Sequence, residues 1–496
     1  MNRSSFIKQL AETSEFDICV IGGGATGLGI AIDAATRGYK TVLFEKSDFA
    51  KGTSSRSTKL VHGGVRYLQQ GNIKLVMEAL KERGLLLKNA PHLVHNQKFV
   101  VPNYKWWEKP FYGIGLKIYD WMAGSLGLGP SQLLSKEETL NLAPTLDPED
   151  LTGGVLYHDG QFDDARLAIN MAQTAARYGG LVLNYFPVTG LLKIQQQVCG
   201  VWVKDYFTGK DYEVKSKVVI NATGVFTDEV LRMDDPKHES IISPSQGIHL
   251  VVDKEFLPGD TAIMIPKTDD GRVLFAVPWH NKIVLGTTDT PVETVTDEPV
   301  PMQQEIEFIL KHIGRYLTKD PQLSDVKSMF AGLRPLVKGK SKITSALSRD
   351  HQISISESEM ITITGGKWTT YRKMAEDTVN LAAEKMRSQI TSVTKDLKLE
   401  APATDIPAEI TTLTNEELKK IIKEAVQKEM CMTVEDFLSR RTRQLLLDAT
   451  AAINMAPAVA YQMAAEMNKD EKWVQQQITN FNEIAKNYIP TINTKL

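Results

Sequence analysis

The segment Phe16–Lys46, FDICVIGGGATGLGIAIDAATRGYKTVLFEK, constrains the fold more than any other part of the chain. Its apolar start is rich in β-branched residues and predicts a short buried strand. Three glycines follow with the spacing G-x-G-x-x-G: Gly22, Gly24 and Gly27. In such a turn the first glycine permits a tight bend, the second lets backbone approach a pyrophosphate, and the third lets helix pack closely on strand.

The rest of this segment completes a strand–helix–strand unit. Leu28–Arg37 is mostly small and apolar, as expected of a helix that packs on a sheet, and Thr41–Phe44 predicts a second strand. Glu45 ends that strand, 18 positions after Gly27 (45 − 27), close to where a carboxylate can accept hydrogen bonds from a ribose. A glycine triplet alone is weak evidence, but the complete unit predicts a dinucleotide site. An ordinary strand–turn–helix with a flexible loop would leave the acidic residue unexplained.

The composition excludes several classes of protein. The 496 residues suffice for two or more domains, and 58 basic against 60 acidic residues give no global field for nucleic acid. Cys19, Cys199 and Cys431 show no metal-ligand spacing and no disulfide framework, which favours a reducing compartment and predicts no metal site. Met1–Glu15 lacks the apolar core of a secretory signal, and no apolar run reaches the roughly 18 residues of a membrane span.

Two further regions follow the nucleotide-binding start. The middle of the chain mixes helices with strand-like runs, which predicts a mixed or antiparallel sheet along one wall of a pocket. These runs are Gly153–Phe162, Gly247–Val252, Arg272–Trp279 and Lys282–Thr290. After the proline-bearing linker Ala401–Pro407, the pattern from Thr414 onward predicts a small helical domain.

Three glycine-marked segments are candidates for further cofactor contacts. Gly52–Leu68, GTSSRSTKLVHGGVRYL, combines short hydroxyl donors with paired glycines; a polar surface loop is the alternative. In Val218–Asp228 and Ile361–Ala382 a strand ends in a glycine turn. A cofactor lying extended between such turns would explain all three. The candidate residues are Thr53, Ser54, Ser57, Gly63, Gly64, Ala222, Gly224, Gly366, Lys367 and Thr369.

Cationic and titratable residues in apolar runs are candidates for a substrate site. Arg334 lies in MFAGLRPLV and Arg349 in SALSRDHQI, and an arginine among apolar residues needs a partner. That partner is either a structural carboxylate, such as Asp350 or Glu357, or an anionic substrate. His249 lies on an apolar strand, where a lone histidine is more often structural than catalytic.

Together, four segments strongly resemble the FAD-dependent glycerol-3-phosphate dehydrogenases, most of all the aerobic, bacterial, quinone-linked enzymes. They are IGGGATGLGIAIDAATRG, TSSRSTKLVHGGVRYL, AGLRPL and GGKWTTYRKMAE, and the similarity runs from about Phe16 to the end of the chain. The resemblance implies FAD rather than NAD, with Glu45 on the adenosine ribose and the glycine turn on the pyrophosphate.

The resemblance also implies a fold and its domains. We expect an α/β, Rossmann-like FAD-binding domain with an inserted mixed or antiparallel sheet that binds substrate, followed by an all-helical C-terminal domain. The expected oxidoreductase region is 1–395, with FAD-binding segments at about 16–90, 150–235 and 330–390 and substrate or cap segments at about 91–149 and 236–329. The expected helical domain is 396–496.

By resemblance, a set of residues lines the substrate site: Arg66, Tyr67, His249, Arg334, Arg349 and Lys367. Since glycerol 3-phosphate carries about two negative charges, Arg66, Arg349 and Lys367 are the phosphate candidates. His249 is the candidate base by its intrinsic pKa, and Arg334 would stabilise developing negative charge, so that His249, Arg334 and Lys367 form the catalytic set. Trp368 departs from the family pattern, where an aliphatic residue is expected after GGK.

The implied reaction oxidises sn-glycerol 3-phosphate to dihydroxyacetone phosphate and passes electrons to a membrane quinone. The alternatives are an oxidase that forms hydrogen peroxide from oxygen and, from a different class, a flavin-fold binding protein without turnover. A quinone acceptor implies a cytoplasmic protein attached peripherally to the inner face of the cell membrane. A homodimer is a further prediction for this chain.

Two stretches are candidates for attachment to the membrane surface. Tyr104–Gly129 interleaves three tryptophans with lysines, and Ser439–Leu447, SRRTRQLLL, places Arg440, Arg441 and Arg443 before an apolar run. The alternative is that both pack internally, with the aromatic residues in the core and the arginines paired with acids such as Glu435 and Asp436. Residues alone slightly favour internal packing, and the resemblance to quinone-linked enzymes favours the membrane.

Overall fold

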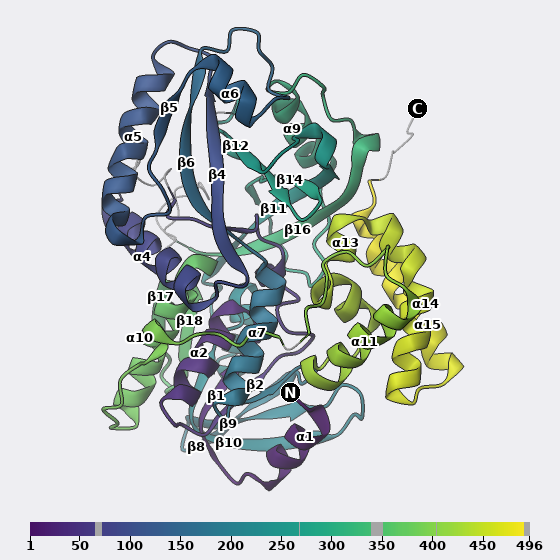
Figure 1. Cartoon of the computed structure of the whole chain (residues 1–496). Coiled ribbons are helices and arrows are strands. Elements are labelled where there is room, and N and C mark those ends of the chain that lie inside the picture. Colours follow the sequence, from purple (N-terminus) through teal and green to yellow (C-terminus); the bar gives the residue numbers. More distant parts are fainter. Residues whose placement is uncertain (65–71, 267, 339–350, 403, 491–496) are drawn as a thin grey trace.

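The computed structural model describes residues 1–64, 72–266, 268–338, 351–402 and 404–490. Within these ranges an eight-stranded sheet forms the lower half of the molecule in Figure 1, in the order β17-β18-β10-β1-β2-β7 with β9 and β8 extending from β10. Its central strands are parallel, as the strand–helix–strand pattern predicted. The strands are β1 (Phe16–Ile21), β2 (Thr41–Phe44), β7 (Leu181–Leu183), β8 (Val188–Ile194), β9 (Gln197–Lys204), β10 (Asp211–Asn221), β17 (His351–Ile355) and β18 (Ile361–Gly365).

Helix α2 (Ala25–Thr36) is nearly all small or apolar because it packs on this sheet between two other helices, α7 (Asp164–Arg177) and α10 (Tyr371–Lys385). The buried side chains of β1, β2 and α2 form the centre of the largest core cluster. Gly38 follows this helix with φ +84°, a left-handed conformation that glycine adopts readily after a helix end.

A second, ten-stranded sheet lies in the upper half of Figure 1. It is mixed, because β4 and β12 are parallel while the other pairs are antiparallel. Its described strands are β3 (Leu60–Val61), β4 (Val94–Asn103), β5 (Gln132–Leu134), β6 (Gly153–Phe162), β11 (Ile242–Asp253), β12 (Thr261–Ile265), β13 (Leu274–Trp279), β14 (Lys282–Gly286), β15 (Thr290–Pro291) and β16 (Val326–Val337). The fold class expected from the sequence is therefore confirmed.

Several helices surround these sheets. They are α1 (Arg3–Glu12), α4 (Ile73–Asn89), α5 (Glu108–Ala123), α6 (Lys136–Leu142), α8 (Thr227–Asp234) and α9 (Gln303–Gly314). Helix α5 lies at the outer edge of the molecule, beside β5 (Figure 1).

The C-terminal part of the chain is helical and lies at the right of Figure 1, beside both sheets. It comprises α11 (Asn415–Glu429), α12 (Val434–Asp436), the π-helical turn η9 (Phe437–Arg441), α13 (Gln444–Leu447), α14 (Ala449–Met467) and α15 (Glu471–Ala485). The caps explain these boundaries: the hydroxyl of Thr414 accepts from Glu417 N, and Glu417 in return accepts from Thr414 N. The apolar core of these C-terminal helices also includes Val251 and Phe330 of the second sheet.

Candidate active site

The predicted glycine turn between β1 and α2 contacts a second turn that lies 200 residues later in the chain. Gly22 has φ +109°, and a Cβ built on it would lie 2.7 Å from the carbonyl oxygen of Ala222. A Cβ on Gly27 would lie 1.9 Å from the carbonyl oxygen of Gly22. Side chains at these two positions are therefore sterically excluded, which is what a close helix–strand approach under a dinucleotide requires.

The N-terminus of α2 is suited to an anion. Gly24 is its N-cap and supplies no side chain to bond the free amides, and the first turn contains no acidic residue. Ser54 borders this end, where its hydroxyl accepts a hydrogen bond from Ala25 N at 2.9 Å. The remaining amides and the positive end of the helix dipole favour a phosphate group.

Glu45 lies at the carboxyl end of β2 and fixes the rim of the same turn. Its Oε2 accepts from Gly23 N at 2.7 Å and its Oε1 accepts from Ser47 N at 2.9 Å. Burial raises the pKa of Glu45 above its ordinary value, and the hydrogen bonds from Ser47 and Gly23 act in the opposite direction. The carboxyl group lines the cleft, and the hydrogen bonds from these two backbone amides hold its orientation.

The predicted cofactor residues gather around one elongated cleft along the carboxyl ends of the parallel strands. Those that line it are Gly22, Gly24, Glu45, Thr53, Ser54, Ala222, Gly224, Gly366 and Lys367. The steric exclusion at Gly22 and Gly27 and the uncapped start of α2 fit a dinucleotide such as FAD. These residues would hold its pyrophosphate and ribose.

A second cavity continues from this cleft beneath the ten-stranded sheet. Thr53, Gly366, Lys367 and Trp368 line both spaces and form the passage between them. The predicted residues in the second cavity are Thr53, Ser57, Gly64, His249, Arg334, Gly366, Lys367 and Thr369. The geometry therefore places a candidate substrate chamber at one end of the dinucleotide cleft.

His249, on β11, is buried in the wall of this chamber. Its Nε2 lies 2.9 Å from the hydroxyl oxygen of Thr58, and its ring stacks on Phe330 with centroids 4.9 Å apart. Burial, followed by the positive charges of Lys59 and Arg334, lowers the pKa of His249 well below its ordinary value. The imidazole is therefore neutral at physiological pH and able to accept a proton.

Arg334, on β16, presents its guanidinium to a loop that follows β14. Its two terminal nitrogens donate to Thr288 O at 2.8 Å, to Thr287 Oγ1 at 3.2 Å and, less closely, to Asp289 at 3.4 Å. The sequence left two kinds of partner open, a structural carboxylate and an anionic substrate; Asp289 is a partner of the first kind, and Asp350 lies outside the described residues. The arginine still lines the chamber together with His249.

Two predicted glycines lie outside both cavities. Gly27 packs helix on strand, as described above. Gly63 N donates to the hydroxyl of Tyr119 at 2.8 Å, and a Cβ there would lie 2.5 Å from that same oxygen. Its missing side chain thus makes room for Tyr119. Arg66, Tyr67 and Arg349, which the sequence predicted for the substrate, lie outside the described residues.

Sequence reasoning missed the residues that hold the chamber wall. Asp164 accepts from Ser57 Oγ at 2.7 Å and from Lys59 Nζ at 2.8 Å, with both side chains of the ion pair fully buried. Since Thr58 lies between Ser57 and Lys59, this carboxylate fixes the threonine that bonds His249. The only signal was Asp164 at the start of a helix, where an acidic residue is ordinary.

Trp368, at the position where the resemblance predicted an aliphatic residue, has a defined place in the structure. Its Nε1 donates to Ser54 O at 2.8 Å, and its ring meets Phe162 and Tyr371 edge-on at 5.1 and 5.4 Å. The indole therefore joins the first and last glycine-marked segments at the passage between the two cavities.

Comparison with known proteins agrees with this geometry. Residues 17–372 match the family "FAD dependent oxidoreductase", and residues 359–474 match the "C-terminal domain of alpha-glycerophosphate oxidase". The mitochondrial glycerol-3-phosphate dehydrogenase of Macaca fascicularis is 41% identical over 98% of this chain and 75% of its own length. That of Schizosaccharomyces pombe is 44% identical over 76% of this chain and 63% of its own.

A solved structure gives the same result for the whole chain. The glycerol-3-phosphate dehydrogenase from Bacillus halodurans, complexed with FAD, is 29% identical with a TM-score of 0.80, covering 99% of each chain. Fold and cleft together define an FAD-dependent oxidoreductase, and FAD is its cofactor. Within that class, the chain belongs to the FAD-dependent glycerol-3-phosphate dehydrogenase family.

Proposed function

We propose that this enzyme oxidises sn-glycerol 3-phosphate to dihydroxyacetone phosphate and delivers the electrons to a quinone in the membrane. The observation that carries the proposal is the chamber in which His249, Arg334 and Lys367 meet at the end of the dinucleotide cleft. A base, a charge stabiliser and a phosphate-binding cation are the groups that oxidation of this alcohol requires. A non-catalytic binding protein would not need them beside a flavin.

In this proposal the imidazole of His249, whose Nε2 lies 2.9 Å from the hydroxyl oxygen of Thr58, accepts the proton of the C2 hydroxyl. Thr58 holds the imidazole in orientation, and Arg334 stabilises the negative charge that develops on the C2 oxygen. FAD, when bound, supplies the acceptor for the hydride that leaves C2. Lys367 binds the phosphate, a role that it shares with Arg66 and Arg349 outside the described residues.

The acceptor is tested by supplying glycerol 3-phosphate to the purified holoenzyme with a soluble dye, a quinone analogue or oxygen alone. We expect the dye and the quinone analogue to be reduced without oxygen, and little hydrogen peroxide to form in air. Peroxide formed in proportion to the substrate consumed would instead identify an oxidase. Failure of glycerol 3-phosphate to reduce any acceptor would overturn the proposed reaction.

The exposed apolar side chains of helix α5 favour a membrane acceptor. No helix in the described ranges is long and apolar enough to span a bilayer. On α5 and just before it, however, large apolar side chains recur at every third or fourth position and face outward. The exposed residues are Trp107, Phe111, Ile114, Ile118 and Trp121, with Trp106 beside them. Trp106 and Trp121 are 83% and 82% exposed.

This stripe reverses the usual pattern, in which the apolar face of a surface helix packs inward. The opposite face of α5 is already buried through Leu116 and Tyr119. On the neighbouring α4, Ile73 and Met77 are exposed as well. An aromatic patch of this kind flanked by Lys105 and Lys117 suits the headgroup layer of an anionic bilayer.

The second candidate for membrane attachment is wrong. Arg440, Arg441 and Arg443 are buried, and so are the leucines that follow them. Arg440 pairs with Glu435 and Asp436, as the internal alternative proposed. A cytoplasmic location on the inner face of the membrane therefore rests on α5 in our proposal, and the homodimer stays a prediction.

Replacing the exposed pair Ile114 and Trp121 with serine is expected to weaken binding to anionic liposomes by about tenfold or more, because apolar burial in the interface is lost. Quinone reduction should slow in parallel, while the soluble dye is reduced at the wild-type rate. Reversing the charge of Lys105, Lys109 and Lys117 should weaken liposome binding at low salt and have less effect at high salt.

Tyr206→Ser is the matched control, since Tyr206 is a 67% exposed aromatic residue away from α5. It should leave liposome binding unchanged. A wild-type enzyme that ignores liposomes even at low salt would remove the membrane from the proposal and favour a soluble acceptor.

A further inference from the structure

The loop that follows β2 divides its side chains between the cofactor cleft and the C-terminal helices. Within residues 45–54, all positions except Asp48 and Phe49 line the dinucleotide cleft. Phe49 is buried in the main core, and Ala50 N, at φ +60°, donates to Gly23 O at 3.0 Å. Asp48 points the other way, into the C-terminal domain. This loop, residues 45–54, is called the cofactor loop below.

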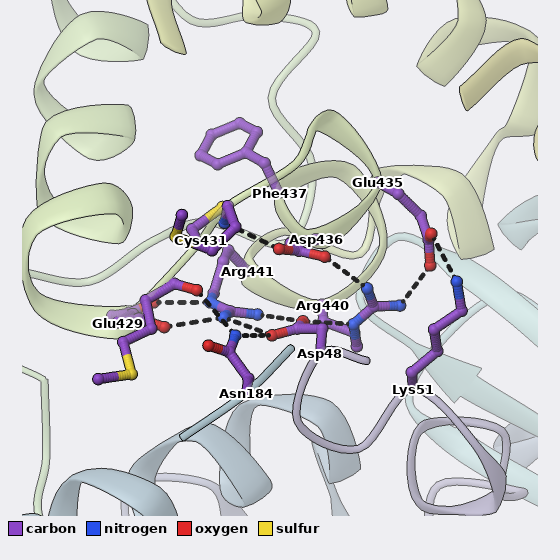
Figure 2. Close-up of polar contacts among 12 residues, drawn as sticks. Asp48, Lys51, Asn184, Glu429, Cys431, Glu435, Asp436, Phe437, Arg440 and Arg441 are labelled. Atoms are coloured by element: carbon purple, nitrogen blue, oxygen red, sulfur yellow. Dashed lines mark hydrogen bonds and ion pairs between the residues drawn. The ribbon is translucent and has the colours of Figure 1, made fainter. Parts of the chain in front are cut away.

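Asp48 is held by two consecutive arginines of the turn η9 (Figure 2). Arg441 donates to both carboxylate oxygens, at 2.7 and 2.9 Å, and Arg440 Nε donates to Oδ2 at 2.6 Å. Asn184 Nδ2 completes the set at 3.0 Å. All three charged side chains are at most 3% exposed. Burial alone would raise the pKa of Asp48, but the two guanidinium groups more than offset it and hold that pKa below its ordinary range.

The contact continues along the cofactor loop as a row of alternating charges. Arg440 also donates to Glu435 at 2.9 Å, and Glu435 accepts from Lys51 Nζ at 2.7 Å (Figure 2). Lys51 lies in the wall of the cofactor cleft. On its other side it approaches Glu298 at 3.5 Å, and Glu298 accepts from Arg56, which lines the substrate chamber. The row therefore runs from the C-terminal domain past both cavities.

Buried charges of this kind are stable only with their partners in place, because an unpaired buried charge costs several kcal/mol. Asp48 thus fixes the cofactor loop in one position for as long as Arg440 and Arg441 are docked. A loop that is free to move would reach its binding conformation for only a fraction of the time, and the apparent affinity for the cofactor would fall by that fraction.

We propose that the C-terminal helical domain preorganises the FAD cleft through Asp48, which makes Arg440 and Arg441 positioning residues for cofactor binding. Neither arginine lines the cleft, so each acts through the cofactor loop. This assigns a function to the helical domain that is separate from substrate chemistry.

The test measures the Kd for FAD of apoprotein by titration with flavin fluorescence, together with the melting temperature of the apoprotein. Arg441→Gln should raise this Kd by about tenfold or more and leave the KM for glycerol 3-phosphate unchanged at saturating FAD. Arg441→Lys, which keeps the charge but not the paired donors, should recover part of the loss.

Arg443→Gln is the matched control. Arg443 is an equally buried arginine two positions away and also pairs across the domain interface, with Asp163 at 2.8 Å. Asp163 lines neither cavity. The variant also removes the hydrogen bond that Arg443 donates to Arg441 O at 2.7 Å, but it leaves the side-chain contacts of Arg441 with Asp48 in place. It should therefore lower the melting temperature while leaving the Kd for FAD within about twofold of wild type.

Equal increases of the Kd in Arg441→Gln and Arg443→Gln would reduce both arginines to general stabilisers of the interface and overturn the proposal. An unchanged Kd in Arg441→Gln would do so too. If that protein does not fold, Glu435→Gln, which is partly exposed and touches Lys51, decides by the same comparison. It should raise the Kd for FAD by about threefold, because the cofactor loop loses one contact, the ion pair between Lys51 and Glu435.

Discussion

Replacing His249 with alanine is expected to lower kcat by about 10²- to 10⁴-fold, the typical loss when a general base is removed. The KM for glycerol 3-phosphate should change little, because the proposed phosphate contacts lie on other residues. The expectation rests on a neutral imidazole in the wall of the chamber, 2.9 Å from Thr58 and beside Arg334. Steady-state kinetics with a soluble dye measure both constants without involving the membrane.

The pH dependence adds a second measurement. Because burial, Lys59 and Arg334 lower the pKa of His249, the base stays deprotonated below the usual histidine range. At saturating substrate the kcat of the wild type should therefore remain flat as pH falls through about 6.5, the ordinary histidine pKa, and decline only at lower pH. His158→Ala, at a histidine outside both cavities, is the control and should leave kcat unchanged. If His249→Ala raises only KM, the histidine is a binding residue, and Arg334 or Lys367 becomes the next candidate for the base.

The parts of the fold that follow from local rules could be predicted from the sequence. A G-x-G-x-x-G turn allows few structures, so strand, helix, second strand and Glu45 all lie where the pattern placed them. Distant glycine segments were also assigned to one site. Their mutual contact, between Gly22 and Ala222, was beyond reach because nothing local specifies which turns meet.

Charged residues were harder to interpret, because the partner of a charge decides its role. Arg440 and Arg441 before three leucines fit a membrane surface as well as a core. Asp48 settles the question, and it lies 392 residues away from Arg440. The sequence slightly favoured a buried place for the tryptophans of α5 since aromatic residues are usually core. The sequence does not show which face of α5 packs inward. In the structure Leu116 and Tyr119 are buried, which leaves the aromatic stripe exposed on the opposite face.

Thr58 illustrates a third limit. It was one of several short hydroxyl residues in a polar segment, of which only Thr53, Ser54 and Ser57 were named as candidates. The structure separates them because Asp164 fixes Ser57 and Lys59 on either side, which leaves Thr58 facing His249. Supporting residues of this kind show no sequence pattern of their own, so sequence reasoning finds the candidate base and not the residues that orient it.

Gly27→Ala is expected to raise the Kd for FAD by about 10- to 100-fold, because the extra methyl group costs about 1–3 kcal/mol in a tightly packed site. A Cβ there would lie 1.9 Å from the carbonyl oxygen of Gly22. That atom belongs to the backbone, so no side chain can rotate away, and α2 must move off β1. Moving α2 displaces the free amides that would face the pyrophosphate of bound FAD.

Gly115→Ala tests whether the effect belongs to the site, since a Cβ on Gly115, in the middle of α5, meets nothing within 4 Å. This control should bind FAD as the wild type does, because alanine is favoured over glycine inside a helix. Flavin absorbance of the purified proteins and titration of the apoproteins with FAD compare the two variants directly. A Gly27→Ala protein that is purified fully yellow, with the wild-type Kd, would mean that the glycine turn can widen without losing the cofactor. The contact between Gly27 and Gly22 would then contribute packing alone, and the amides of α2 would not depend on it for their position.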